Sequence, residues 1–405
     1  MDDFGSTLRQ HRKAAGWSLR KFAEHIAYDF GYLGQIERGE RPSTAEVVAA
    51  YDRKLAAGGA LETAYASRQA GEADMRRRSV LQTVGILAAM PTVDRLVGWE
   101  AVRHGLGEAV DVEWDEWAAI VDDYGRGYYL QPHDQLMVQL GRDLTVLQHQ
   151  LAAANGNRRA NLLRVAARLS VVIALGLVAS GQAAIARRWW RTAQRVADES
   201  ADTETRVLTR AWDVVNGCYD GRSPVSVVAL SDQVLPLLDG PASAAGCGLL
   251  AGRAQALSLA GRHGEAVDTV RHLARHVETL PAEVVEDVES LWGWPEHRLR
   301  HTESWVYTHA SLSAAASVAQ ERALALYPAS QQRLRTQVQL HRAASLIRGG
   351  HIPDGLRHAA DLLDRLPRDQ HNELVRSVAR QVLAVVPNGE RARAVYGELV
   401  ERVRV

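Results

Sequence analysis

The chain has very little cysteine: Cys218 and Cys247 are the only two among 405 residues. Two cysteines are too few for a disulfide scaffold, and these two lack metal-ligand spacing. This scarcity suits a reducing cytoplasm, and we expect a cytoplasmic protein. The stretch from Met75 to Met90 resembles a twin-arginine export signal, but it lies inside the chain and its apolar part ends at Pro91.

Lysine is absent after Lys54. The remainder of the chain therefore cannot supply the lysine of a phosphate-binding P-loop or of a Schiff base. The sequence also lacks a G-x-S-x-G motif and a paired Cys-His signature for a nucleophile. His272 and His276, like His297 and His301, are four residues apart, which is compatible with metal binding, but no third ligand accompanies them. We expect no enzyme, no metal site and no cofactor.

Net charge is also absent, because 48 basic side chains balance 48 acidic ones. Whole-molecule attraction to nucleic acid is thereby excluded, and any affinity for DNA must come from a local patch. No apolar run approaches the ~20 residues that span a membrane, so we expect no membrane partner. A basic patch without acidic residues does occur between residues 4 and 23, formed by Arg9, Arg12, Lys13, Arg20 and Lys21.

Residues 18–38 have the pattern of two short helices that cross closely. A turn over Ala27 to Asp29 separates them, and the Asp29 carboxylate can cap the second helix, which we expect over about Phe30 to Arg38. This pattern predicts a helix-turn-helix whose second helix enters the major groove of DNA. The apolar and small positions at helical spacing are Leu19, Phe22, Ala23, Ile26, Leu33 and Ile36.

This stretch resembles the Xre/Cro phage-repressor family over about Phe4 to Leu55. Leu19 stands where the family usually has a phosphate-contacting Gln, and Ala27 stands where it usually has a turn Gly. We expect the turn to form at Ala27 without a positive φ. The positions that match the family pattern are Arg12, Phe22-Ala23, Tyr32-Leu33, Ile36-Glu37 and Gly39.

The resemblance implies a role for individual side chains. Arg12 and Glu37 would form a buried structural pair, and Gln35 would read an adenine edge. Phe30 could contact a thymine methyl group or pack back on the preceding helix. Together, the implied base contacts are Phe30, Gly31, Tyr32 and Gln35, and the implied phosphate contacts are Ser18, Arg20, Lys21, Arg38 and Arg41.

Two differently composed parts meet near Met75, since all three Phe and all Lys precede it. We expect an all-α protein: a five-helix, lambda-repressor-like DNA-binding domain over residues 1–72, a linker and connecting helix over 73–112, and a helical-repeat domain over 113–405. The Arg76 to Arg78 run in the linker could touch phosphates or form a solvated hinge.

From Trp114 onward every periodic segment is helical and no strand pattern appears. The unit from Leu249 to His276 resembles a tetratricopeptide hairpin, which implies a tetratricopeptide-like α-solenoid of about five hairpins. Helices at Asn372 to Val386 and Arg391 to Val403 would close it. Turn signals between paired helices recur at Ser180-Gly181, Asp220-Gly221, Ala260-Gly261, near Ser311, and at Gly349-Gly350.

The combination of the two domains resembles regulators of high-GC Gram-positive bacteria and, more distantly, the peptide-sensing RRNPP group. That resemblance implies an effector groove in the repeat domain, where Asn216 could contact a peptide backbone. The alternative is that Asn216 is an exposed helix residue, and Trp212 and Trp305 could belong to the groove or to the core. Trp189, Trp190, Trp292 and Trp294 leave the same alternatives open.

The sequence thus predicts a transcriptional regulator that binds double-stranded DNA. One domain of this kind covers too little DNA, so we expect a homodimer on an inverted repeat. A peptide, a small molecule or a protein would act as effector. The alternative is an interaction scaffold or antitoxin-like protein with little operator specificity, which Leu19 and the neutral net charge favour.

Overall fold

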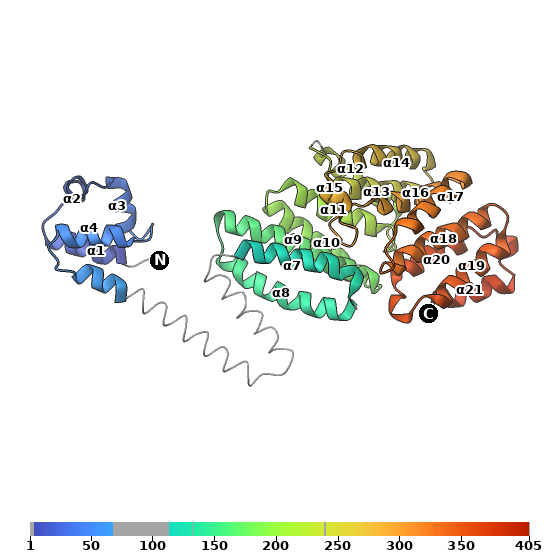
Figure 1. The fold of residues 1–405 in the computed structure, drawn as a ribbon, viewed down its shortest axis with the longest axis horizontal. Coiled ribbons are helices and arrows are strands. Elements are labelled where there is room, and N and C mark those ends of the chain that lie inside the picture. The colour runs from blue at the N-terminus through green and yellow to red at the C-terminus, as the bar shows by residue number, and fades with distance from the viewer. Residues whose placement is uncertain (1–3, 68–112, 132, 239, 405) are drawn as a thin grey trace, which may run out of the picture. The chain divides into compact units, whose positions relative to one another are not determined.

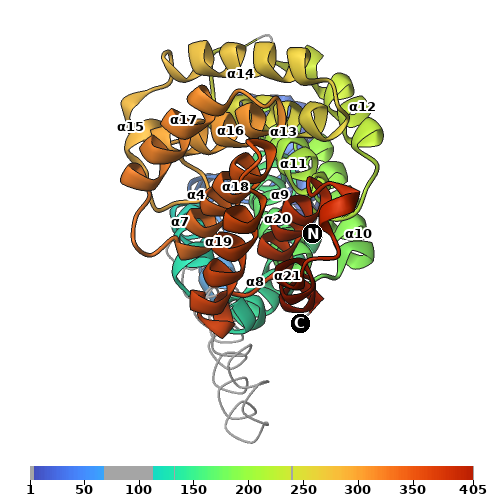
Figure 2. The same ribbon diagram turned by 90° about the vertical axis from the view of Figure 1, so that its right-hand side faces the viewer.

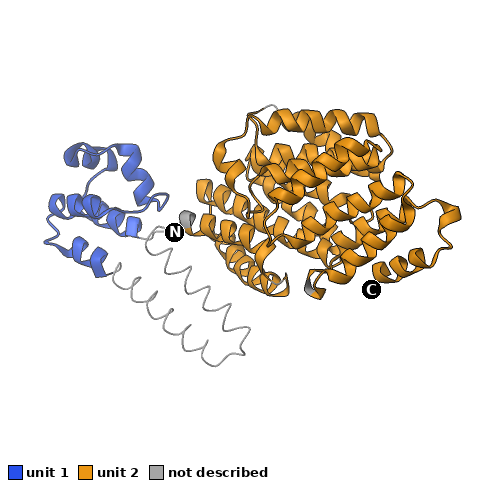
Figure 3. Ribbon diagram, turned by 45° about the vertical axis from the view of Figure 1, so that its right-hand side comes forward, with its two compact units in different colours: residues 1–102 blue, residues 103–405 orange. Residues whose placement is uncertain are grey.

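The computed structural model describes residues 4–67, 113–131, 133–238 and 240–404. Every regular element in these ranges is a helix, which confirms the all-α prediction. The chain divides into two compact units, residues 1–102 and 103–405 (Figure 3). The predicted linker over 73–112, its Arg76 to Arg78 run and the Met75 to Met90 segment lie outside the described residues, so the domain boundaries at 72 and 113 stay predictions.

In its described part, residues 4–67, the first unit is a bundle of five short helices around a small core (Figure 1). Its helices are α1 (Phe4–Ala14), α2 (Leu19–Ile26), α3 (Phe30–Glu37), α4 (Ala45–Lys54) and a last one covering residues 60–67 in the described part. Each amphipathic helix turns its apolar side inward, as its periodicity predicts. The largest fully buried side chains there are Leu8, Phe22, Leu33, Ile36, Tyr51 and Leu61.

Short polar side chains define where these helices begin. The side chains of Ser18, Asp29 and Thr44 accept hydrogen bonds from the backbone N–H groups of Lys21, Tyr32 and Val47, at 3.4, 2.8 and 3.4 Å. Such caps satisfy N–H groups that have no partner inside the helix. The predicted cap at Asp29 is therefore confirmed.

The turn between α2 and α3 differs from the prediction. Ala27 adopts the left-handed conformation, with φ 56° and ψ 43°, and its N–H group closes α2 on the carbonyl of Ala23. The expectation of a turn without positive φ was wrong, because the tight angle between the helices needs a left-handed residue at this position. An alanine there is strained by its Cβ atom, by ~1–2 kcal/mol.

The second unit is a stack of antiparallel helical hairpins preceded by two helices (Figures 1 and 2). The hairpins are α9/α10, α11/α12, α13/α14, α16/α17 and α18/α19, with α20/α21 at the C-terminal end; the first helices of successive hairpins pack on one another. The bounds are α7 (Glu113–Leu130), α8 (His133–Ala153), α9 (Gly156–Ala179), α10 (Ala183–Glu199), α11 (Thr203–Gly217), α12 (Pro224–Val234), α13 (Ala244–Leu259), α14 (His263–Val277), α15 (Ala282–Glu286), α16 (Glu296–His309), α17 (Ser313–Leu326), α18 (Gln332–Arg348), α19 (Ile352–Arg365), α20 (Glu373–Ala384) and α21 (Ala394–Arg404).

The hairpin turns occur where the sequence predicts them. All five turn residues have positive φ, between 58° at Ser311 and 89° at Gly350, and glycine adopts this conformation without strain. The turn residues are Gly181, Gly221, Gly261, Ser311 and Gly350.

One helix of the described part, α9, is long and apolar enough to cross a membrane by length and composition. Arg164 and Arg168 interrupt this helix, so the chain has no uninterrupted apolar run near ~20 residues. Within the fold, 83% of the apolar window is buried, because α9 packs against α7, α8, α10 and α11. Its apolar surface thus faces protein on nearly all sides, as in a central core helix.

Candidate functional site

The exposed face of α3 is the candidate nucleic-acid interface. Leu33 and Ile36 bury the opposite face in the core, so Gly31 and Gln35, four residues apart, lie together on the open side. Phe30 precedes them and remains 52% exposed. A large apolar side chain so exposed is available for contact, and the predicted base-contacting residues Phe30, Gly31 and Gln35 are all accessible.

Tyr32, the fourth predicted base contact, is half-buried. Its ring stacks on Tyr28 at 6.2 Å between centroids, and the Arg41 guanidinium lies 5.0 Å from its centroid. Tyr32 thus positions Arg41 through a cation–π interaction. Base contact by Tyr32 itself stays a prediction.

The predicted phosphate-contacting cations are all exposed, but they are not equivalent. Arg38 forms a bidentate ion pair with Glu40, with Nε–Oε1 and Nη2–Oε2 distances of 2.7 and 2.9 Å. For Arg20, Lys21 and Arg41, no carboxylate lies within ion-pair distance among residues 4–67. These three cations carry an unbalanced positive charge.

Ser18, the remaining predicted phosphate contact, is exposed at the start of α2. Its hydroxyl accepts the hydrogen bond from the Lys21 N–H group, so its first role is to cap the helix. The hydroxyl hydrogen remains free to donate to an anion.

The predicted pair of Arg12 and Glu37 is present. Arg12 Nε and Nη2 donate to Glu37 Oε1 and Oε2 at 2.7 and 2.6 Å, and both side chains are buried. Tyr51 Oη donates to Glu37 Oε1 at 2.9 Å, and Arg12 Nη1 donates to the Trp17 carbonyl at 2.6 Å. The hydrogen bond to Glu37 raises the pKa of Arg12, and burial raises that of Tyr51. This network joins α1, α3 and α4 and so fixes α3 on the domain.

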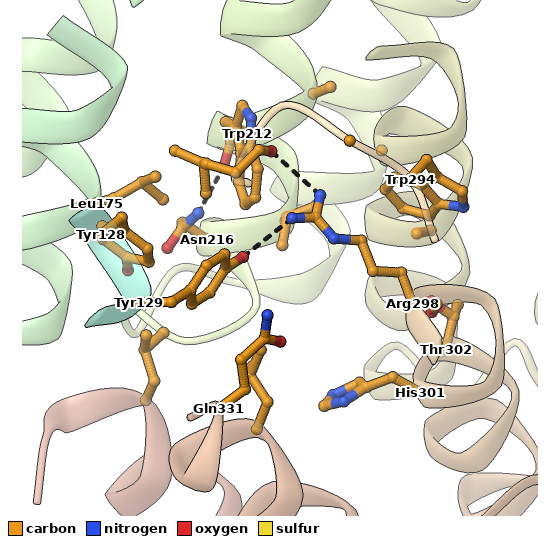
Figure 4. A pocket seen from close by; sticks show the side chains of 18 of the residues that line it. Tyr128, Tyr129, Leu175, Trp212, Asn216, Trp294, Arg298, His301, Thr302 and Gln331 are labelled. Carbon is orange, nitrogen blue, oxygen red and sulfur yellow. Dashed lines mark hydrogen bonds between the residues drawn. The ribbon is translucent and has the colours of Figure 1, made fainter. Parts of the chain in front are cut away.

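The second unit contains a cavity of about 150 Å³, lined by segments that lie far apart in the sequence (Figure 4). Asn216 and Trp212 of α11 line it, together with Trp292 and Trp294. The 287–295 loop connects α15 to α16 and forms part of the cavity wall.

Asn216 is buried, and its Nδ2 atom donates to the Trp212 carbonyl at 2.9 Å. The alternative that it is an exposed helix residue was therefore wrong. Trp305 does not line the cavity: it is fully buried and packs against Tyr219 and His341, with centroids 5.5 and 5.4 Å away. Its assignment to an effector groove is corrected, because it sits on the side of α16 that packs into the core.

Sequence reasoning missed the residues that complete the cavity. Tyr129 of α7, Arg298 of α16 and Gln331, just before α18, all lie around it, yet they are separated by more than thirty residues from one another. Periodicity cannot bring such segments together. The local signal was the Trp292-Gly-Trp294-Pro sequence, whose rigid, aromatic character interrupts the helical pattern.

The histidines noted in the sequence have structural surroundings. Burial lowers the pKa of His297 to about 3 and that of His301 to about 4, so both are neutral near pH 7. His301 Nδ1 and Tyr327 Oη are hydrogen-bonded at 2.9 Å. The rings of His272 and His276 touch, with centroids 5.4 Å apart. In the described residues no three metal-ligating side chains gather at one place.

Residues 3–64 match the helix-turn-helix domain family, which covers the whole candidate interface and its supporting network. No curated protein and no solved structure matches the chain. The first unit thus contains a helix-turn-helix domain, and such a domain indicates a DNA-binding regulator.

Proposed function

We propose that this protein is a sequence-specific transcriptional regulator of the Xre type that binds double-stranded DNA as a homodimer. The observation that carries the proposal is the open face of α3. Gln35 and Gly31 are exposed there on a helix whose other face is locked into the core. A helix presented in this way can enter the major groove, where a glutamine amide can form a bidentate contact with adenine.

The unpaired cations support this assignment. Arg20 and Lys21 lie at the start of α2, and Arg41 follows α3, so they flank the helix that would enter the groove. Phosphate contacts from both sides position such a helix without reading sequence. Arg38 contributes less, because Glu40 already balances its charge.

A single domain reads only a half-site, and a dimer on an inverted repeat supplies the second one. The second unit would then serve as the sensing and dimerisation domain. Its stacked hairpins and positive-φ turns support a tetratricopeptide-like solenoid, a class of fold that presents concave binding surfaces. The cavity beside Asn216 and Trp212 is the place proposed for an effector.

The second candidate function is an interaction scaffold or antitoxin-like protein with little operator specificity. Two observations favour it: Leu19 is half-buried against the core instead of supplying a polar phosphate contact, and the Arg38–Glu40 pair removes one cation from the interface. The two candidates differ in whether a defined DNA sequence is bound.

Selection of bound DNA from a random pool by the purified full-length protein tests the proposal. We expect an enriched inverted repeat with half-sites about one helical turn, or a multiple of it, apart. A pool that stays random would favour the scaffold. Repetition with Gln35→Ala should relax one position of each half-site, at ~1–3 kcal/mol per lost contact.

Arg20→Ala is the matched test of positioning. It should weaken binding to all sequences alike and lower the salt slope by about 1, because one phosphate contact is lost. Arg53→Ala, an exposed cation of α4 outside the proposed interface, is the control and should change neither quantity. Equal loss on every sequence for Gln35→Ala would contradict a base-reading role for that residue.

A further inference from the structure

We propose that the cavity in the second unit binds a small molecule with a flat, apolar body and one carboxylate group. The statement that this molecule is the effector rests on the proposed function. The statement that the cavity binds it can be tested without DNA.

The wall of the cavity is rich in aromatic side chains. Trp212, Trp292 and Trp294 line it together with Tyr128 and Tyr129 of α7. Flat aromatic faces favour a flat apolar ligand, which they can stack against or meet edge-on. The body of the ligand is therefore apolar and planar.

The charge on the cavity is positive and unbalanced. Arg298 and Arg333 both line it, and no Asp or Glu does so. Neither arginine has a carboxylate within ion-pair distance in the described part of the second unit. Two partly buried cations without an anion raise the electrostatic potential of the space between them, so an anionic group of a ligand is favoured there.

Arg298 is held in place by neutral groups. Its Nη2 atom donates to Tyr129 Oη at 3.1 Å and to the Ser290 carbonyl at 2.9 Å, and Nη1 donates to the Leu291 carbonyl at 3.2 Å. The guanidinium group also lies 5.8 and 5.6 Å from the ring centroids of Trp212 and Trp294. These partners fix its position without neutralising it. Three hydrogen bonds leave two of its five N–H groups for a ligand.

Arg333 is held in a similar way from the other side. Its Nη2 atom donates to the Tyr128 carbonyl at 3.2 Å, and its guanidinium group lies 5.9 Å from the Tyr128 ring centroid. The fork of an arginine matches the geometry of a carboxylate, and bidentate pairing adds specificity.

Polar atoms in the wall also lack partners. Gln331 Oε1, Gln255 Oε1 and Trp294 Nε1 are buried in cavity-lining residues and make no hydrogen bond in the described structure. Buried polar groups are normally satisfied, and an unpaired one costs free energy. A ligand that draws these side chains toward the cavity would give the buried atoms a partner. Figure 4 shows the Gln331 amide reaching toward Tyr129 and Arg298.

The volume limits the ligand. A cavity of about 150 Å³ accepts a molecule built on one or two rings. An aryl or indolyl carboxylate fits the aromatic wall, the two arginines and the size together.

Isothermal titration of the full-length protein with benzoate, phenylacetate and indole-3-acetate, each beside its neutral amide, tests the proposal. At least one carboxylate should bind ~10–100-fold more tightly than its amide, because the amide lacks a charge-assisted hydrogen bond to arginine. Equal or tighter binding of the amides, or no binding by any of the three acids, would overturn it. Tighter binding of an N-acetylated, C-amidated dipeptide would assign the cavity to peptides instead.

Gln331→Glu gives a sharper test, because it places inside the cavity the carboxylate that the ligand would bring. We expect at least a tenfold loss of carboxylate binding, with little change in binding of the amide. Gln332→Glu adds the same charge one residue away, on an exposed side chain. It should leave the binding of the carboxylate and of the amide unchanged. Equal effects of the two variants would contradict a local role of the cavity.

Arg333→Gln should weaken carboxylate binding ~10-fold or more, whereas Arg342→Gln, on the exposed side of α18, should not. Far-ultraviolet circular dichroism of each variant verifies that it is folded.

Carboxylate binding without an enriched DNA sequence would support the binding site and contradict the proposed function. An enriched operator without carboxylate binding would support the proposed function and overturn the carboxylate site.

Discussion

Arg12 and Glu37 form a buried, bidentate ion pair between α1 and α3, with Nε–Oε1 and Nη2–Oε2 distances of 2.7 and 2.6 Å. Tyr51 of α4 adds a hydrogen bond to the same carboxylate. The pair lies behind the exposed face of α3, so the orientation of the DNA-facing side chains depends on a contact that no DNA would touch.

Glu37→Ala should therefore unfold the first unit, because it leaves Arg12 buried without its anion. The expected loss of stability is ~3–5 kcal/mol. All lysines of the chain, Lys13, Lys21 and Lys54, lie in this unit, so pulse proteolysis by a lysine-specific protease in urea reports its unfolding selectively. Glu46→Ala, on the exposed side of α4, is the control, and an unchanged urea midpoint for Glu37→Ala would refute the structural role.

Ala27→Gly should stabilise the first unit by up to ~1 kcal/mol, because glycine adopts the φ of 56° without a Cβ clash. The same lysine-specific proteolysis measures it. Ala14→Gly, at the exposed C-terminal end of α1, provides the opposite control and should destabilise by up to ~1 kcal/mol. If both substitutions lower the stability equally, the left-handed conformation of Ala27 carries no strain that glycine relieves.

Acid should destabilise the first unit through Asp52. Its carboxylate accepts hydrogen bonds from the N–H groups of Gly59, Leu61 and Glu62 at 2.7, 2.7 and 3.3 Å. Burial raises the pKa of Asp52, but these bonds outweigh it and leave the pKa below its ordinary value. The stability that they supply is complete above the unfolded pKa of ~3.9 and is lost as pH falls through the lower folded pKa.

Urea midpoints between pH 6 and pH 2 measure this effect. Asp52→Asn should lower the midpoint at pH 6 and flatten its decline below about pH 4. Glu46→Gln, a carboxylate at an exposed position, should leave both features as they are. If the urea midpoint of Asp52→Asn depends on pH as it does in the unsubstituted protein, Asp52 does not cause the loss of stability in acid.

Gly125→Ala should disturb the contact between α7 and the 287–295 loop. A Cβ atom at residue 125 would lie 2.4 Å from Trp292 Nε1, which donates to the Val121 carbonyl at 2.9 Å. The Leu291 N–H group also donates to the Gly125 carbonyl at 2.9 Å. The overpacked variant should lose ~1–3 kcal/mol of stability.

Urea unfolding followed by tryptophan fluorescence measures the loss. Gly141→Ala, on α8 where the added Cβ atom meets nothing within 4 Å, should instead gain up to ~1 kcal/mol. A neutral Gly125→Ala variant would mean that Trp292 moves freely, and the cavity wall would then be less fixed than the structure indicates.

Much of the fold was predictable from local pattern. Helical periodicity placed α2 and α3, and the turn signals placed Gly181, Gly221 and Gly261, because spacing and backbone freedom act over a few residues. The left-handed Ala27 was not predictable in this way. Its conformation is imposed by the packing of α2 and α3, which overrides the preference of alanine.

The candidate sites divide along the same line. Exposure of Gln35 and the Arg12–Glu37 pair followed from the family pattern, since position in a short helix fixes which side a residue faces. The fate of the tryptophans did not follow, because Trp305 and Trp212 have similar helical neighbourhoods, yet one packs in the core and the other lines the cavity.

The sequence by itself determined the helices, the turns between them and the residues that α3 exposes, because these depend on short-range spacing, capping and backbone freedom. Only the tertiary structure decided that Tyr129 and Arg298, 169 residues apart, meet across one cavity, and that no acidic side chain lines it. The physical reason is that such partners are chosen by the stacking of whole hairpins, in which each contact depends on every helix between them.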